Sequence, residues 1–269
     1  MEVSKLKEIS DLVLQAVKEA SKEVMDIYGL DRIEAEDKED GSPVTLADKV
    51  SHEILATSLG LIDANIPVLS EEGDSLNNNF ELFWLIDPLD GTKEFINKNG
   101  EFTVNVALIE RKVPILGVVA APAIDETFIG YADQAYKLVN EEPEKITSRK
   151  QSHDHCLVTV SKSHKSEKDQ LFIDLCKNEF NTVEELPTGS SLKLCRVAEG
   201  RADIYNRLGP TYQWDIAAGQ AIVEAAGGVV LDLNGNPLRY EFNSSKKNPL
   251  FFCTGDSSYP WKDIFSKLI

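Results

Sequence analysis

The stretch WLIDPLDGTKEF, Trp84–Phe95, places two aspartates at the end of an apolar run. The run up to Ile86 is typical of a buried strand. Asp87 and Asp90 follow it, and a buried carboxylate without a partner is costly, two beside each other even more so. The stretch therefore predicts either a solvated acidic turn or a site where bound cations neutralise the two carboxylates.

The residues around the two aspartates predict a sharp turn that leads into a helix. Pro88 fixes φ and lacks an amide donor, so we expect the strand to end there. Gly91 permits a tight turn or the close approach of a ligand. A helical turn opened by Lys93 and Glu94 would leave the amides of Gly91 and Thr92 facing outward, and such an end binds anions. Carboxylate oxygens select hard cations such as Mg²⁺, so a metal ion that also contacts a phosphate fits this stretch.

Composition and charge favour a globular protein that handles small molecules. The chain has 269 residues, of which 42% are hydrophobic and 27% charged, and its formal net charge is −17. Such a charge opposes binding to nucleic acid or anionic lipid, and the sequence contains no Lys/Arg-rich run. An anionic small molecule would still bind where cations reverse the local field.

Several features predict a cytoplasmic location. The N-terminal MEVSKLKEIS lacks the apolar core of a signal peptide, and no apolar run approaches the ~20 residues of a membrane span. Peripheral association with the inner face of the cell membrane stays open as an alternative. The four cysteines form no CxxC pair, which argues against zinc or a disulfide framework and predicts buried thiols in a reducing compartment; they are Cys156, Cys176, Cys195 and Cys253.

The first part of the chain, 1–145, predicts a mixed α+β lobe with an antiparallel sheet. Apolar residues recur with a helical period over 4–28, ended by Gly29, and a second helix is expected from Thr45 to Leu59. A polar loop or hairpin lies between them. Short strands are predicted at 66–70, 83–87, 102–110, 113–122, 126–132 and 135–140.

The second part, 146–269, predicts an α/β lobe. The polar, pattern-free segment 140–155 marks the boundary. Strands then alternate with helices, as in an α/β layer. The strands are expected at 156–162, 182–187, 202–208, 227–233 and 251–255, and helices from about Ser166, Ser190 and Asp215 and at the C-terminus.

Further acidic residues lie at strand ends and helix starts. Glu71 and Glu72 follow a predicted strand in VLSEEG, Thr45 and Asp48 are three apart in DGSPVTLAD, and Asp215 lies in YQWDIAAG. Each has an ordinary structural explanation: a solvated loop, a helix start with an acidic first turn, and an N-cap. Together they fall where α/β proteins assemble their sites, which favours a functional cluster.

The chain contains four segments in the order DGSPVTLAD, SEEG, WLIDPLDGT and YQWDIAAG. In sequence and order they resemble the motifs of the metal-dependent, lithium-sensitive phosphatases of the inositol monophosphatase and fructose-1,6-bisphosphatase superfamily. The resemblance covers nearly the whole chain and implies a layered αβαβα sandwich of the sugar-phosphatase type. DPLDGTKEFI, VSKSH and GSSLKLCRVAEGRADIY are most similar to the 3′(2′),5′-bisphosphate nucleotidases of the CysQ type within that superfamily.

This resemblance also implies a site. Asp48 and Thr92 would orient and deprotonate the attacking water, and the amides of Gly91 and Thr92 would hold the phosphate. The site would hold two or three Mg²⁺ ions, and Asp87 would bridge a pair of them. The expected ligands are the carboxylates of Glu71, Asp87, Asp90 and Asp215 and the carbonyl of Leu89, and of these Glu71, Leu89, Asp90 and Asp215 would also contact the substrate.

The expected substrate contacts otherwise lie in the second lobe. The segment 161–164, SKSH, would contact adenosine through Ser163 and His164, although Lys162 stands where we expect arginine, which changes any bidentate or stacking contact. Helix-terminal amides at Ser190 and Ser191, assisted by Lys193, would bind a second phosphate, and Arg207 is a further candidate. The structural alternatives are a surface histidine, a serine N-cap beside a solvated lysine, and a surface arginine.

The resemblance implies hydrolysis of adenosine 3′,5′-bisphosphate to AMP and phosphate, linked to sulfur assimilation and nucleotide recycling. The alternatives are an inositol-phosphate or other sugar-phosphate phosphatase on the same scaffold, an aspartyl-phosphate enzyme, and a binding module without turnover. The aspartyl-phosphate motif DxDxT has its aspartates two apart, whereas Asp87 and Asp90 are three apart. The expected partner is therefore a small nucleotide, without nucleic acid or a transmembrane segment, and the chain is either a monomer or a homodimer.

Overall fold

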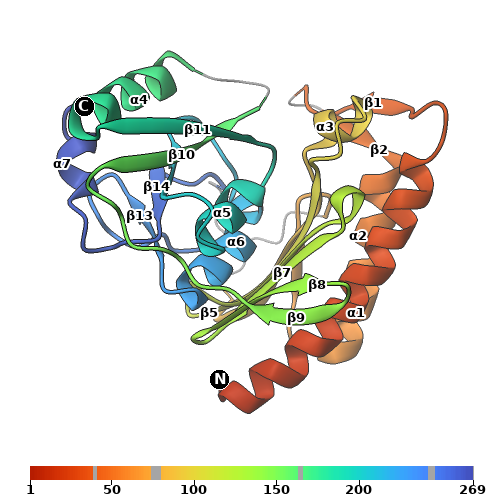
Figure 1. Cartoon of the computed structure of the whole chain (residues 1–269). Helices are drawn as coiled ribbons and strands as arrows, with labels where there is room; N and C mark the ends of the chain where they lie inside the picture. The colour runs from red at the N-terminus through yellow and green to blue at the C-terminus, as the bar shows by residue number, and fades with distance from the viewer. Residues whose placement is uncertain (39–40, 74–79, 163–165, 242–245, 269) are drawn as a thin grey trace.

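Helices and sheets alternate in five layers in the computed structural model, which describes residues 1–38, 41–73, 80–162, 166–241 and 246–268. Helices α1 and α2 form one outer layer, followed by a seven-stranded sheet, helices α5 and α6, a five-stranded sheet, and helices α4 and α7 (Figure 1). The predicted αβαβα sandwich is confirmed.

The first outer layer follows from the apolar period of the N-terminal segment. Helix α1 (Val3–Tyr28) buries one face that includes Val13, Val17 and Val24, and it packs along α2 (Leu46–Ile62). Between the two helices, β1 (Ala35–Asp37) and β2 (Pro43–Thr45) form the expected hairpin. Thr45 caps α2, so the predicted helix start is confirmed.

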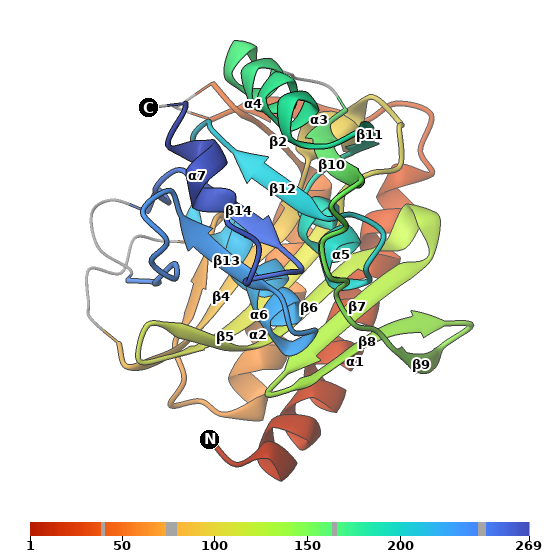
Figure 2. The same ribbon diagram turned by 60° about the vertical axis from the view of Figure 1, so that its left-hand side comes forward.

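The seven-stranded sheet has the sequence order β3-β4-β5-β6-β7-β8-β9, with only β3 and β4 parallel. The last strand lies in the segment predicted to be pattern-free. It forms because a tight turn after β8 pairs its polar residues with that strand, at the edge seen in Figure 2. The strands are β3 (Val68–Ser70), β4 (Leu82–Asp90), β5 (Thr103–Glu110), β6 (Val113–Ala121), β7 (Glu126–Tyr131), β8 (Gln134–Val139) and β9 (Glu142–Lys145), with a 3-10 turn, Pro122–Ile124, between β6 and β7.

Strand β4 continues through Pro88, so the prediction that proline ends the strand is wrong. The pairing with β5 shifts register between Asp87 and Asp90, where Asp90 pairs with Thr103. The irregularity removes Pro88 from the ladder, and a residue without an amide donor is tolerated there. Helix α3 (Thr92–Ile96) then begins after Gly91, whose φ of 89° lies in the left-handed region that favours glycine.

The second sheet is mixed, with the order β11-β10-β12-β14-β13. Strand β10 is parallel to β11 and β12, whereas β14 is antiparallel to β12 and β13. Helices α4 (Glu167–Glu179), which starts next to Ser166 as predicted and is capped by it, and α7 (Trp261–Phe265) form the outer layer. The strands are β10 (His155–Ser161), β11 (Thr182–Thr188), β12 (Ile204–Arg207), β13 (Val229–Asp232) and β14 (Phe251–Thr254).

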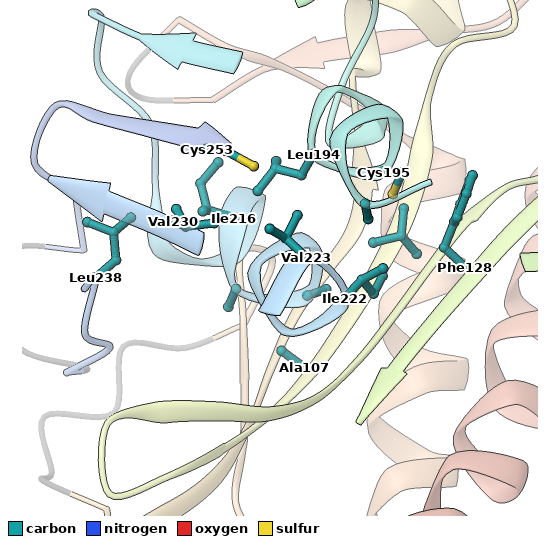
Figure 3. Close-up of a cluster of buried hydrophobic side chains, with 14 of the residues drawn as sticks. Ala107, Phe128, Leu194, Cys195, Ile216, Ile222, Val223, Val230, Leu238 and Cys253 are labelled. Atoms are coloured by element: carbon teal, nitrogen blue, oxygen red, sulfur yellow. The ribbon is translucent and has the colours of Figure 1, made fainter. Parts of the chain in front are cut away.

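The middle layer joins the two sheets. Helix α5 (Leu192–Ala198) begins after rather than at Ser190, and α6 (Gln213–Ala225) begins before rather than at Asp215. Their buried side chains meet residues of both sheets, among them Phe128 on one side and Val230 and Cys253 on the other (Figure 3). All four cysteines are buried and free, as expected. Because α6 packs on both sheets, the division at 145/146 separates the sheets along the chain but not their shared core.

Gly117 and Gly130 allow α6 to lie close against the first sheet. A Cβ atom at Gly117 would come within 2.2 Å of the Ala218 carbonyl oxygen, and one at Gly130 within 2.4 Å of the Ile222 Cα. Either would force the helix away from the sheet. This close approach positions the first turn of α6, which carries Asp215, relative to the end of β4.

Candidate active site

The acidic residues singled out in the sequence gather around the end of β4. They come from the start of α2 (Asp48), the residue after β3 (Glu71), the end of β4 (Asp87 and Asp90) and the first turn of α6 (Asp215). Burial raises the pKa of Asp87 well above its usual range, and the charges of Glu71, Asp90 and Asp215 raise it further. The same repulsion and burial raise the pKa of Asp215. The structure therefore brings these carboxylates within electrostatic reach of one another.

Asp48 and Thr92 are in direct contact. The Thr92 hydroxyl donates to Asp48 Oδ1 at 3.1 Å, while the other carboxylate oxygen accepts from the amide and the hydroxyl of Thr45, each at 2.7 Å. Asp48 is only 1% exposed, and burial raises its pKa to about 6 despite these hydrogen bonds. Its position at the start of α2 is fixed by the Thr45 cap, so the carboxylate is held towards Thr92.

Three of the clustered carboxylates each use one oxygen to hold their own backbone or a neighbouring loop. Asp87 Oδ1 accepts from the Leu89 amide at 3.1 Å, and Asp215 Oδ2 from the Tyr212 amide at 2.9 Å. Asp215 is thus a first-turn acceptor of α6 rather than its N-cap. Asp90 Oδ2 accepts from the Ser191 amide at 2.7 Å. Among the described residues, the second oxygen of each carboxylate receives no hydrogen bond, which leaves it available to a ligand.

The donor set fits a hard divalent cation. All the candidate ligands are oxygens, and their mutual repulsion would be relieved by a positive ion. Lys38 Nζ supplies a positive charge from outside the cluster, at 2.8 Å from Glu71 Oε1 and 2.5 Å from Glu72 Oε1. Within the described ranges no three acidic, histidine or cysteine side chains already form a closed metal cage.

A cavity of about 230 Å³ adjoins the acidic cluster. It lies between the β4–α3 turn, the loop before α5, the end of β12 and the start of α6. Seven of the predicted site residues line it, namely Asp90, Gly91, Ser190, Ser191, Lys193, Arg207 and Asp215, together with Ser161. Ser163 and His164 lie outside the described residues.

The cationic residues of this cavity are Lys193 and Arg207. Lys193 is 7% exposed, so the alternative of a solvated lysine is wrong. Burial lowers its pKa to about 8, opposed chiefly by the charge of Asp90, and its Nζ donates to the Ser190 carbonyl at 2.7 Å. The Arg207 guanidinium donates to the Pro210 carbonyl at 2.7 Å. Both groups can counter a second anionic group in the cavity.

The backbone before α5 differs from the prediction. The Gly189 amide donates to Glu101 Oε2 at 2.7 Å and the Ser191 amide to Asp90, so neither faces the cavity as a free phosphate donor. The Ser190 hydroxyl donates to the carbonyls of Asp90 and Glu101. Helix α5 contributes Lys193 to the cavity, while the Ser191 amide just before the helix bonds to Asp90 in the first half of the chain.

Sequence reasoning missed residues that support the site. Thr103 and Asn105 are buried polar residues of β5, and both bond to the Ser191 hydroxyl at 2.8 Å. The available signal was two polar residues within an apolar strand beside β4. Lys38 was concealed in an acidic run, and its ion pair spans segments distant in sequence. Glu101 directly precedes a predicted strand and carried no local signal.

The buried acids predict an unusual dependence of stability on pH for the metal-free protein. Carboxylates whose pKa is raised by folding stabilise the folded state at low pH, and this contribution is lost as the pH rises through the folded-state pKa, about 6 for Asp48. Glu71, Asp87, Asp90 and Asp215 shift in the same direction, also through burial. We expect the Tm in EDTA to fall between pH 5 and 7, and to fall less with Mg²⁺.

Thermal unfolding at closely spaced pH values checks this. Asp256, with a pKa of about 2, remains ionised across that window, and Lys193, at about 8, remains protonated, so neither reverses the sign. A Tm that rises from pH 5 to 7 in EDTA would contradict the assignment of buried, mutually repelling carboxylates.

The fold and this arrangement of acids define a family of proteins. A family model described as the inositol monophosphatase family matches residues 5–250. The chain belongs to the inositol monophosphatase family.

Within that family, the similarity to particular proteins is closer. The chain is 41% identical over 250 residues to the Escherichia coli K12 protein named 3′(2′),5′-bisphosphate nucleotidase CysQ, covering 90% of this chain and 97% of that one. It is 34% identical to the protein of that name from Haemophilus influenzae, covering 87% of this chain and 88% of the relative.

Solved structures of this family have a similar fold. The crystal structure of CysQ from Bacteroides thetaiotaomicron, a bacterial member of the inositol monophosphatase family, superimposes with a TM-score of 0.81 at 35% identity, over 92% of this chain and 97% of that one. A Thermotoga maritima inositol monophosphatase shares the fold, with a TM-score of 0.77 at 24% identity over 96% of each chain. None of the helices in the described ranges combines the length and apolar character that a membrane span requires.

Proposed function

We propose that the protein is a Mg²⁺-dependent phosphomonoesterase that converts adenosine 3′,5′-bisphosphate to AMP and phosphate. The observation that carries the proposal is the cluster of buried carboxylates beside a cavity that also contains Lys193 and Arg207. Two zones of charge suit a substrate with two phosphates, one cleaved and one bound. The similarity to proteins named 3′(2′),5′-bisphosphate nucleotidase supports the choice of nucleotide.

The metal ions would be held by the acids around β4. Glu71, Asp87, Asp90 and Asp215 offer carboxylate oxygens and Leu89 its carbonyl. Bound Mg²⁺ would polarise the phosphoryl oxygens, lower the pKa of the attacking water and stabilise the leaving oxygen. An acid–base pair alone supplies only ~10²–10⁴ in rate, whereas the acceleration of phosphate monoester hydrolysis can reach ~10²¹. A mechanism built on Asp48 and Thr92 without cations would therefore be insufficient.

The protein's own contribution to proton transfer is the contact between Thr92 and Asp48. Because the Thr92 hydroxyl directs its proton at Asp48, its oxygen can accept a hydrogen bond from water. As that water attacks phosphorus, its proton passes to the Thr92 oxygen while the threonine proton passes to Asp48. The bond between phosphorus and the 3′ oxygen breaks, and the leaving oxygen takes up a proton from solvent. The amides of Gly91 and Thr92 would hold the phosphate oxygens.

The second phosphate would be recognised by the cationic groups of the cavity. Lys193 is within the field of Asp90, which favours its charged form. Arg207 enters from β12 and Lys193 from α5, so the second half of the chain supplies these contacts while the first half supplies most of the metal ligands. A sugar phosphate with a single phosphate would leave these cations without a substrate phosphate to bind, which disfavours inositol 1-phosphate as the preferred substrate.

Phosphate release from purified protein tests the proposal. Adenosine 3′,5′-bisphosphate and inositol 1-phosphate are assayed separately and in competition with Mg²⁺, with Asp90→Asn as the inactive control. We expect kcat/KM to favour the nucleotide and activity to disappear in EDTA. A dominant preference for inositol 1-phosphate would reassign the substrate, and nucleotide turnover no faster than that of the control would refute the proposal.

A further inference from the structure

Glu101 connects the metal-binding half of the molecule to two segments of the second half. It lies between α3 and β5, and its side chain is 21% exposed. Its Oε2 accepts from the Gly189 amide at 2.7 Å, and its Oε1 pairs with Lys162 Nζ at 3.2 Å. Its carbonyl oxygen accepts from the Ser190 hydroxyl at 2.8 Å. One residue thus holds both the end of β10 and the loop before α5.

The loop fits closely against Glu101. A Cβ atom at Gly189 would lie 2.7 Å from both the Cβ and the carbonyl oxygen of Glu101, so a larger residue is excluded. Ser190 has φ of 46°, in the left-handed region that a residue with a side chain seldom adopts. Such a conformation persists only where the surroundings impose it. Here the imposed contacts are the hydrogen bonds of the Ser190 hydroxyl to the carbonyls of Asp90 and Glu101.

This loop forms part of the cavity wall and contacts its charged groups. Gly189, Ser190 and Ser191 line the cavity. The Ser190 carbonyl accepts from Lys193, and the Ser191 amide donates to Asp90. A shift of the loop would therefore move the cation that faces the second phosphate. Removal of the Glu101 carboxylate would also take away the partner of Lys162, one residue beyond β10.

We propose that Glu101 is a positioning residue for substrate recognition, which fixes the 189–191 loop and Lys162 so that the cavity accepts the part of the substrate remote from the cleaved phosphate. The inference rests on the proposed function. Replacing Glu101 should therefore change KM for a nucleoside bisphosphate much more than kcat. It should change KM for a small phosphate monoester little.

Steady-state kinetics of Glu101→Ala and Glu101→Gln test this, with adenosine 3′,5′-bisphosphate and p-nitrophenyl phosphate as substrates. In Glu101→Ala we expect KM for the nucleotide to rise roughly 10-fold or more, since a charge-assisted hydrogen bond is lost and the buried Gly189 amide is left without its acceptor. Its kcat should change less than about threefold, and KM for the small ester less than about twofold, because neither depends on the lost hydrogen bond. Glu101→Gln retains an acceptor for Gly189 and should lie between wild type and alanine.

Two controls separate positioning from general destabilisation. Glu184→Ala removes a hydrogen bond between Glu184 and His155, 3.2 Å long and away from the cavity, and should behave as wild type. Lys162→Met and Glu101→Gln should have non-additive effects on KM for the nucleotide when combined, since the two side chains contact each other. If Glu101→Ala does not fold, Glu101→Gln and this cycle still test the inference.

The outcomes distinguish the two proposals. A wild-type enzyme that leaves the bisphosphate intact overturns the proposed function. With an active wild type, the Glu101 variants could instead keep an unchanged KM for the nucleotide, or show KM raised by the same factor for both substrates. Either result overturns only the role of Glu101.

Discussion

Replacing Asp87 by asparagine should abolish Mg²⁺-dependent phosphatase activity while stabilising the metal-free protein. Asp87 is 1% exposed, and its charge is opposed first by burial and then by the other acids of the cluster. Asparagine keeps the shape and an acceptor for the Leu89 amide but removes the charge. The loss of a ligand to the ions that stabilise the transition state should lower kcat by roughly 10³-fold or more.

The stability effect has the opposite sign. At pH 8 in EDTA we expect the Tm of Asp87→Asn to exceed that of wild type by a few degrees, since ~1 kcal/mol corresponds to about 2–4 °C in domains of ~150–250 residues. Mg²⁺, which should raise the Tm of wild type, should have little effect on the variant. Differential scanning calorimetry with and without Mg²⁺ measures both. Asp133→Asn, in the exposed turn between β7 and β8, is the matched control and should change neither property. A destabilised Asp87→Asn protein that retains its Mg²⁺ response would contradict a metal-ligand role.

Asp48→Asn should separate turnover from binding. Asparagine can still accept from Thr45 and hold the start of α2, but it cannot take up the proton directed at it by Thr92. We therefore expect kcat to fall ~10²–10⁴-fold, the range that general acid–base catalysis contributes. Substrate affinity and the Mg²⁺ concentration at half-saturation should remain within about threefold of wild type, since the introduced amide keeps the hydrogen bonds that hold the site.

Titration calorimetry of the slow Asp48→Asn variant with the nucleotide and Mg²⁺, beside single-turnover kinetics, measures the two quantities. Thr92→Ser, which keeps the hydroxyl, should retain most of the activity, whereas Thr92→Ala should resemble Asp48→Asn. An equal loss of affinity and turnover in Asp48→Asn would show that Asp48 holds the site together rather than acting on the water.

The parts of the fold predicted from sequence are those with strong local patterns. The period of α1, the helix starts near Thr45 and Ser166 and the apolar strands of the first sheet are encoded within short segments. Strand β9 was not predicted, since its pairing is set by the turn after β8 rather than by its own polar residues. The prediction that Pro88 ends the strand was wrong for a similar reason, because the bulge that accommodates Pro88 depends on the partner strand.

In the site too, residues marked by local patterns were predictable, whereas contacts between distant segments were not. Asp48, Asp87, Asp90 and Asp215 lie at element ends that the sequence marks, so their convergence was predictable once the motifs were taken together. The environments of Lys193 and Arg207 depend on how α5 and β12 pack, and no local pattern reports that burial. The occupied amides of Gly189 and Ser191 arise from contacts between residues about a hundred positions apart, Asp90 with Ser191 for example.

Four acids from three separate segments of the chain should bind shared divalent cations. Anomalous diffraction from a crystal soaked in Mn²⁺, with AMP and phosphate present, tests this most directly. We expect at least two anomalous peaks at the end of β4, each within bonding distance of oxygens from Asp87 and from one or more of Glu71, Asp90 and Asp215, with Lys38 displaced from Glu71. Peaks only elsewhere on the molecule, or none while these carboxylates keep the contacts described above, would contradict it.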